Sequence, residues 1–241
     1  MSKRILTIFP HPDDAETAAG GTLLRWARQG HQLTLCILTD GDKGTADPTM
    51  SREALVQQRR QEQARAADLL GAELVFLGLE DGLVQPTLEL RREMVRVMRT
   101  VRPHVVVAND PTVWFRFGAY INHPDHRATG QAVVEALYPA VKKPGIFPEL
   151  MAEGVLPHVV EEVWLTPTEQ PDHWEDISDV FEEKMALILT HASQFPPEPT
   201  RRVFSRMAQL CGEPRGLPLA ESFRTLRLTA STIQGLAGRG F

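Results

Sequence analysis

The sequence predicts an α/β fold, a Rossmann-like and mostly parallel sheet with helices on both faces. Four short apolar runs rich in β-branched residues are typical of buried strands, and they lie at 4–9, 33–38, 73–77 and 104–108. Segments with helical periodicity fill the gaps between these runs. Because neighbouring parallel strands need a crossover connection, this alternation indicates right-handed β-α-β units.

Helix start and stop signals support each connecting element in turn. A first helix is expected at 15–29, directly before a glycine, which is typical of the position just past a helix end. Ser51 can cap a second helix that runs to Leu70, also before a glycine. A third helix at 88–101 ends ahead of a proline, which cannot continue it. Together these elements form the expected core, about residues 1–140.

A C-terminal α/β extension of the same domain is expected at about 141–241, so that 1–241 is a single domain. Its predicted elements are a proline-rich loop at 142–157, a strand at 158–165, a helix at 179–193, a proline-rich turn at 195–200 and a helix at 201–210. The segment 230–241 has little periodicity and is expected to be a mobile tail.

The composition is that of an ordinary folded chain and excludes several classes of protein. Of the 241 residues, 42% are hydrophobic and 24% are charged, close to the average for globular domains. A formal net charge of −5 without a basic run argues against a nucleic-acid partner. Cys36 and Cys211 lie far apart in the sequence, which excludes a disulfide framework and a cysteine metal site. No stretch approaches the ~20 apolar residues that span a bilayer. We therefore expect a cytoplasmic protein with no membrane partner.

Two short segments carry the residues suited to chemistry. His-Pro-Asp-Asp at 11–14 follows the first predicted strand, and His-Pro-Asp-His at 123–126 follows the fourth. Proline suits the first position of a helix, so each segment is expected at a helix N-terminus. In a Rossmann-like sheet the first and fourth strands are neighbours at the switch point where ligands bind. The two segments should therefore face each other across one crevice.

Imidazole and carboxylate groups without a thiolate indicate a metal site for zinc or another divalent transition metal such as Fe²⁺. We choose His11, Asp14 and His126 as its ligands, because three protein ligands leave a position open for catalysis. A helix N-terminus disfavours a protonated imidazole and so keeps histidine ligands neutral. Three further side chains remain beside the metal without a ligand role: Asp13, His123 and Asp125.

A nucleotide cofactor is not expected. A dinucleotide-binding core would place Gly-X-Gly-X-X-Gly after the first strand, but Asp13, Asp14 and Glu16 occupy that turn and would repel a pyrophosphate. Gly20 and Gly21 come too late in the chain for this role.

At these residues the chain resembles the PIG-L or LmbE-like deacetylases, metal-dependent enzymes that remove acetyl groups from N-acetylglucosamine derivatives. The resemblance rests on the two histidine segments and on Thr-Asp-Gly-Asp at 39–42. It extends over most of the chain, to Arg59 with Glu62, to 76–82, to 184–194 and to Glu-Ser-Phe-Arg at 221–224. It implies a hydrolase whose partner is a small-molecule N-acetyl amino sugar or glycoconjugate.

The resemblance assigns the same three metal ligands and adds roles for the remaining side chains. It makes Asp13 the general base that takes a proton from the attacking water. It makes His123 the residue that stabilises the oxyanion, with Asp125 beside it. We expect Asp125 to hold His123 protonated.

The wall of the substrate pocket is less well defined. Aromatic residues at 114–117 can stack on a sugar face or form a lid packed by its own side chains, and Arg116 can meet an anionic group. Some members that act on sugar thiols have a tyrosine where this chain has Ile121, with Tyr120 one step earlier. His191 can reach the site or cap a helix end.

Two other functions use the same residues. Two histidines and one carboxylate also hold Fe²⁺ in oxygenases, although usually on a different scaffold. A metal-dependent sugar-binding protein without activity is the third hypothesis, and Asp13 argues against it because a carboxylate that does not ligate the metal has no clear use there. A homo-oligomer and the identity of the sugar conjugate are left open by the sequence.

Overall fold

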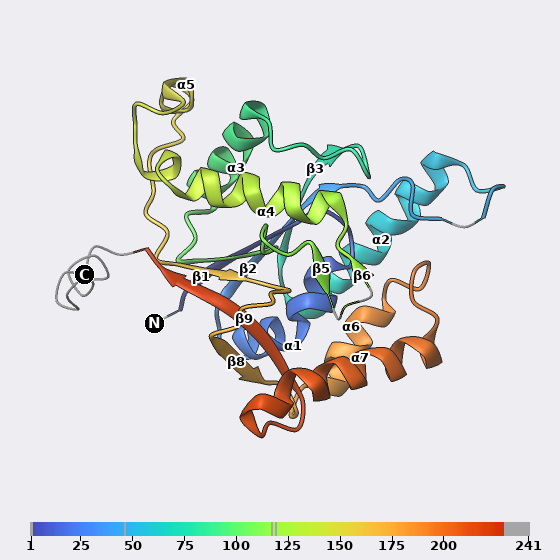
Figure 1. The fold of residues 1–241 in the computed structure, drawn as a ribbon. Coiled ribbons are helices and arrows are strands. Elements are labelled where there is room, and N and C mark those ends of the chain that lie inside the picture. The colour runs from blue at the N-terminus through green and yellow to red at the C-terminus, as the bar shows by residue number, and fades with distance from the viewer. Residues whose placement is uncertain (1, 46, 117, 119, 229–241) are drawn as a thin grey trace.

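A seven-stranded sheet is the central feature of the computed structural model, which describes residues 2–45, 47–116, 118 and 120–228 (Figure 1). Its strands lie in the order β3-β2-β1-β4-β7-β9-β8. They are β1 (Arg4–Phe9), β2 (Gln32–Thr39), β3 (Glu73–Leu79), β4 (Val105–Ala108), β7 (Glu162–Leu165), β8 (His173–Asp176) and β9 (Ala220–Arg227). The pairings from β3 to β7 are parallel, and β9 pairs antiparallel with β7 and β8. The predicted α/β class with a mostly parallel sheet is confirmed.

Helices cover both faces of this sheet. They are α1 (Asp14–Arg28), α2 (Arg52–Leu70), α3 (Leu88–Val101), α4 (Pro124–Leu137), α5 (Pro148–Ala152), α6 (Phe181–Leu189) and α7 (Pro197–Gly212). Successive strand residues point to opposite faces. On β1, Leu6 and Ile8 pack into a core with α3 and α4, whereas Ile5 and Phe9 pack into a second core with α1 and α6 (Figure 1).

The capping residues of α2 and α3 explain why these helices have the limits that the sequence predicts. The Ser51 hydroxyl accepts a hydrogen bond from the Ala54 N–H at 3.2 Å, and α2 ends at Gly71 with a φ of 61°. A left-handed residue also ends α3, but it is Arg102, with a φ of 55°. The helix α1 lies within one residue of its predicted limits.

The C-terminal half differs more from prediction. The helix α7 begins at Pro197, inside the segment expected to be a turn, because prolines suit a first helical turn whose N–H groups have no partner within the helix. The short helix α5 lies in the predicted loop at 142–157. The predicted strand at 158–165 is only four residues long, and the predicted helix at 179–193 shortens to α6.

Several elements were missed by sequence reasoning. The strands β8 and β9 were not predicted, nor was a small hairpin of β5 (Phe115–Arg116) and β6 (Tyr120–Ile121) that precedes α4. The predicted mobile tail at 230–241 lies outside the described residues. None of the described helices is long and apolar enough to cross a membrane.

The C-terminal strands continue the sheet and hold the helix that starts at the site. β7 pairs with β4, which extends the sheet beyond the first four strands. On β9, the Glu221 carboxylate accepts the N–H groups of Gly21 and Thr22 on α1, each at 2.8 Å. The Lys184 ammonium on α6 donates to the same carboxylate at 2.6 Å. These buried bonds fix α1, whose first residue is Asp14, against the C-terminal elements.

Candidate active site

The two histidine segments meet because β1 and β4 are adjacent, as the sequence predicts. Ile8 of β1 pairs with Ala108 of β4, so both strands end at the same edge of the sheet. His11 lies two residues after the end of β1, and α4 begins at Pro124 after β4 and the hairpin. His123 is the N-cap of α4, and its Nδ1 accepts the Asp125 N–H at 3.2 Å.

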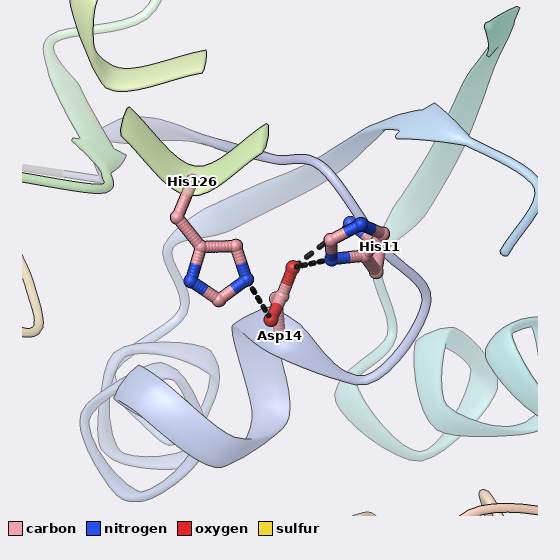
Figure 2. Close-up of side chains that lie close together, drawn as sticks. All are labelled: His11, Asp14 and His126. Carbon is pink, nitrogen blue, oxygen red and sulfur yellow. Dashed lines mark hydrogen bonds and ion pairs between the residues drawn. The ribbon is translucent and has the colours of Figure 1, made fainter. Parts of the chain in front are cut away.

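The three predicted ligands come together, with Asp14 between the two imidazole rings (Figure 2). One Asp14 oxygen, Oδ2, lies 3.1 Å from Nδ1 of His11, and the other, Oδ1, lies 3.2 Å from Nε2 of His126. All three side chains are at most 17% exposed. They form a group of donor atoms that could hold a metal ion.

The outer nitrogen of each ring has its own acceptor. Nε2 of His11 lies 3.1 Å from the Asp81 carboxylate and 3.4 Å from that of Asp125. Nδ1 of His126 lies 3.1 Å from the side-chain oxygen of Asn122. The amide nitrogen of Asn122 donates a hydrogen bond to the Val113 carbonyl. Metal-ligating histidines are held in this way in other proteins, by a second partner that fixes the tautomer.

This arrangement fits a metal cation. If both outer nitrogens carry the proton, the inner nitrogens of His11 and His126 direct lone pairs at the Asp14 carboxylate. Lone pairs and a carboxylate repel one another unless a proton or a cation lies between them. Two imidazoles and one carboxylate are also a donor set that zinc and related divalent ions prefer.

The pKa values show how strongly these groups interact. Burial disfavours the charged form of His11, but the carboxylates of Asp14, Asp125 and Asp81 outweigh it and raise the pKa of this ring well above its usual value. Burial opposes ionisation of Asp14 too, yet His126 and His11 hold the pKa of that carboxyl well below its usual range. A cation that enters this group therefore competes with a proton on His11.

Asp13 has a strained backbone and a well-defined partner. Its φ of 98° lies in the left-handed region, which L side chains seldom adopt. Nη2 of Arg59 donates to Oδ2 of Asp13 and to the Pro12 carbonyl, both at 2.7 Å. Burial first, and then the charge of Asp14, raise the pKa of Asp13 to about 7 against the opposing effect of Arg59. A carboxylate with this pKa is suited to exchange a proton near neutral pH.

The structure corrects the expected link between Asp125 and His123. The Asp125 carboxylate accepts the N–H groups of Gly82 at 2.7 Å and Val84 at 3.2 Å, and it faces His11. Only the backbone N–H of Asp125 bonds to the His123 ring, where Nδ1 is the acceptor. Burial and the nearby charge of His11 lower the pKa of His123, and the opposing charge of Asp125 does not outweigh them. The lowered pKa and the acceptor role of Nδ1 favour a neutral His123 ring with its proton on Nε2, against the expectation that Asp125 keeps this ring protonated.

Several residues at the site were missed. Asp81 precedes a glycine, a pair common in turns, yet its carboxylate lies 3.1 Å from Nε2 of His11. Its position just after a strand was the available signal. Asn122 and Gln63 had no motif around them. The family resemblance includes Arg59 but assigns it no role.

A cavity of about 490 Å³ adjoins the three-residue group, and both Asp14 and His126 line it. Arg116 and Tyr120 of the hairpin line it too, and Tyr120 is 51% exposed. The Arg116 guanidinium lies 3.8 Å from the Glu169 carboxylate. The helix α7 contributes apolar lining residues, Phe204, Met207 and Leu210.

The other residues that the sequence suggests for the pocket wall have partners within the protein. The Arg127 guanidinium lies 3.9 Å over the Trp114 ring, and Trp114 and Phe115 are 57% and 66% exposed. Phe117 lies outside the described residues. His191 is fully buried, and its Nε2 lies 3.6 Å from the Glu16 carboxylate. Ser193 bonds to Glu62 through its hydroxyl and its N–H.

Comparison with known proteins gives a consistent result. A family model described as PIG-L, GlcNAc-PI de-N-acetylase, matches residues 6–137. Diacetylchitobiose deacetylase of Thermococcus kodakarensis is 36% identical over 81% of this chain and 72% of its own length. A probable N-acetyl-alpha-D-glucosaminyl L-malate deacetylase 2 of Bacillus anthracis is 31% identical over 82% of this chain and 84% of its own.

A solved structure agrees with these relatives. N,N'-diacetylchitobiose deacetylase from Pyrococcus horikoshii, complexed with its inhibitor MPG, superposes with a TM-score of 0.87 and 30% identity over 97% of this chain and 89% of that one. The family model matches more than half of the residues of this chain, and diacetylchitobiose deacetylase is 36% identical to it. The chain therefore belongs to the PIG-L family and is a metal-dependent N-deacetylase.

Proposed function

We propose that this enzyme removes the acetyl group from an N-acetylglucosamine-type sugar or conjugate, with zinc held by His11, Asp14 and His126. One observation supports this proposal above the others. The Asp14 carboxylate lies within 3.2 Å of an imidazole nitrogen on either side, at the edge of a cavity of small-molecule size.

Zinc bound by these residues would polarise the amide carbonyl and make water a better nucleophile at neutral pH. The donor set supports zinc because it contains two imidazoles, one carboxylate and no thiolate. Asp81, Asp125 and Asn122 would fix the orientation of the two rings through their outer nitrogens.

Asp13 is proposed as the general base. It lines the cavity next to Asp14, and Arg59 fixes one of its oxygens at 2.7 Å. The pKa of about 7 allows Asp13 to accept a proton from the attacking water and to return it to the departing amine.

His123 is proposed to stabilise the oxyanion as a neutral donor. Its Nδ1 already accepts a backbone N–H, so the ring carries its proton on Nε2. A neutral N–H can bond to the negative oxygen that develops when the amide carbon is attacked. Asp125 acts differently from the sequence expectation, by holding His11 and the segment at 82–84.

The relatives support the substrate class, since the names of two of them specify diacetylchitobiose and an N-acetylglucosaminyl malate. We therefore propose a small N-acetyl amino sugar or glycoconjugate as the partner. A cavity of about 490 Å³ has room for a sugar and part of its substituent.

The test is acetate release from a panel of N-acetyl amino sugars and their conjugates, with the free amine measured in parallel. We expect equal amounts of acetate and amine from at least one substrate, loss of turnover after chelation, and recovery with zinc under anaerobic conditions. His173→Gln, at a partly exposed histidine on β8, is the matched control and should behave as wild type.

Two outcomes would contradict the proposal. Turnover that strictly requires iron and oxygen would indicate an oxygenase. Tight binding of one sugar without hydrolysis of any member of the panel would indicate a binding protein.

A further inference from the structure

We propose that Gln63 on α2 is a positioning residue that holds Asp13 in its left-handed conformation, with Glu16 fixing the orientation of the Gln63 amide. The catalytic part of this inference rests on the proposed role of Asp13. The side-chain oxygen of Gln63 accepts the Asp13 N–H at 3.0 Å. Its amide nitrogen donates to Oε1 of Glu16 at 2.7 Å. Gln63 and Glu16 are both fully buried.

Asp13 needs this support because its backbone is unfavourable for an L residue. With a φ of 98°, it turns the chain sharply between His11 and the start of α1. A hydrogen bond to the Asp13 N–H restrains the peptide at the turn itself. Arg59 restrains the carboxylate and the preceding carbonyl of Pro12. Gln63 and Arg59 lie one helical turn apart on α2, so a single helix holds both the backbone and the side chain of Asp13.

The orientation of the amide decides whether the bond can exist. A flipped Gln63 would point its NH₂ group at the Asp13 N–H, placing donor against donor. Oε1 of Glu16 accepts the hydrogen bond from Gln63, which selects the orientation in which the NH₂ group faces Glu16 and the oxygen faces Asp13. Glu16 lies between Gln63 and His191, whose Nε2 is 3.6 Å from Oε2.

The test compares removal of the amide with an exchange of the two groups. Gln63→Leu removes both hydrogen bonds. The double variant Glu16→Gln with Gln63→Glu, here called the exchanged pair, keeps both hydrogen bonds. The carboxylate at position 63 accepts from the Asp13 N–H and from the amide now at position 16. Gln61→Leu, at an exposed position of the same helix, is the matched control.

Two readouts are measured on zinc-loaded protein. Hydrogen exchange of the peptide containing residues 12–16 reports the Asp13 N–H without any substrate. We expect faster exchange in Gln63→Leu and wild-type protection in the exchanged pair. In the acetate assay we expect kcat of Gln63→Leu to fall by roughly 10-fold or more, with KM and bound zinc near wild type, because a small misplacement of a reacting group reduces the chemical step. The exchanged pair should recover to within about 3-fold of wild type.

Unchanged exchange and unchanged kcat in Gln63→Leu would overturn the inference. The inference would also be overturned if the double variant folds and binds zinc but shows the hydrogen exchange and the turnover of Gln63→Leu. If Gln63→Leu does not fold, the exchanged pair decides alone, since wild-type protection of residues 12–16 supports the inference and lost protection refutes it. A wild-type enzyme that releases no acetate from any sugar would refute the proposed function, whereas the exchange pattern would still decide the role of Gln63 in holding the turn.

Discussion

Asp13→Asn separates the two adjacent aspartates at the start of α1, which have different surroundings. The Asn side chain keeps the shape of Asp13, and its oxygen can still accept from Arg59 at the 2.7 Å position. The Asp13 N–H keeps its bond to Gln63. Arg59 also retains the carbonyls of Pro12 and Gly41 as partners, so the substitution removes charge and basicity but few hydrogen bonds.

The expected magnitude follows from this geometry. Because an amide cannot accept a proton at neutral pH, kcat of Asp13→Asn should fall by at least ~10², the low end for general-base catalysis, which corresponds to about 2.7 kcal/mol in the activation free energy. Metal content should stay close to wild type, since Asp14 and both histidines are unchanged. Asp14→Ala should lose the metal and activity together, because Asp14 bridges the two rings.

The pH dependence gives a second readout with a definite sign. The base must be ionised, so the wild-type rate falls as pH drops through the pKa of Asp13. Burial and the charge of Asp14 place this pKa at about 7, and a bound divalent cation lowers it. We therefore expect an acidic limb of kcat/KM below pH 7 in the wild type.

The assay combines elemental analysis of metal with acetate release across pH. Asp13→Asn that loses the metal while Asp14→Ala keeps it would mean that the two roles are exchanged. Full metal and full turnover in both variants would place the reaction elsewhere in the molecule.

Three further predictions use the same protein. His123→Ala should reduce kcat by ~10²–10³, as expected for loss of one oxyanion donor, and acetate release at the wild-type rate would contradict that role. Zinc binding at pH 7 should release about one proton, because neighbouring carboxylates raise the pKa of His11, and calorimetry in buffers of different ionisation enthalpy checks this; a heat that does not depend on buffer would refute it. Chelated protein should remain folded, since both ligand segments follow completed strands, and circular dichroism showing complete unfolding would instead indicate a structural metal.

The ligand group could be predicted because local and topological rules agree on it. Proline in each histidine segment indicates a nearby helix N-terminus, although only Pro124 is a first helical residue and Pro12 lies two residues before α1. The usual strand order of a Rossmann-like sheet makes β1 and β4 neighbours. Neither rule depends on how side chains pack. The predicted adjacency is confirmed by the pairing of Ile8 with Ala108.

The residues around that group could not be found in the same way. Asp81 precedes a glycine, and this pair is so common in turns that it carries little information about a site. Gln63 reaches Asp13 only because α2 packs beside α1, a relation between layers that periodicity does not reveal. On β9, Glu221 is buried beside Lys184, so a charged residue occupies a core position and weakens the apolar pattern expected of a buried strand.

The contact between β9 and α1 can form only late in the synthesis of the chain. Glu221 binds the N–H groups of Gly21 and Thr22 across a separation of 200 and 199 residues. The helix that begins at Asp14 therefore leaves the ribosome early but gains this anchor only after residue 221 has emerged. During synthesis, a nascent chain that has already formed β1 to β4 therefore still lacks this one restraint on α1, the helix that follows the His-Pro-Asp-Asp turn.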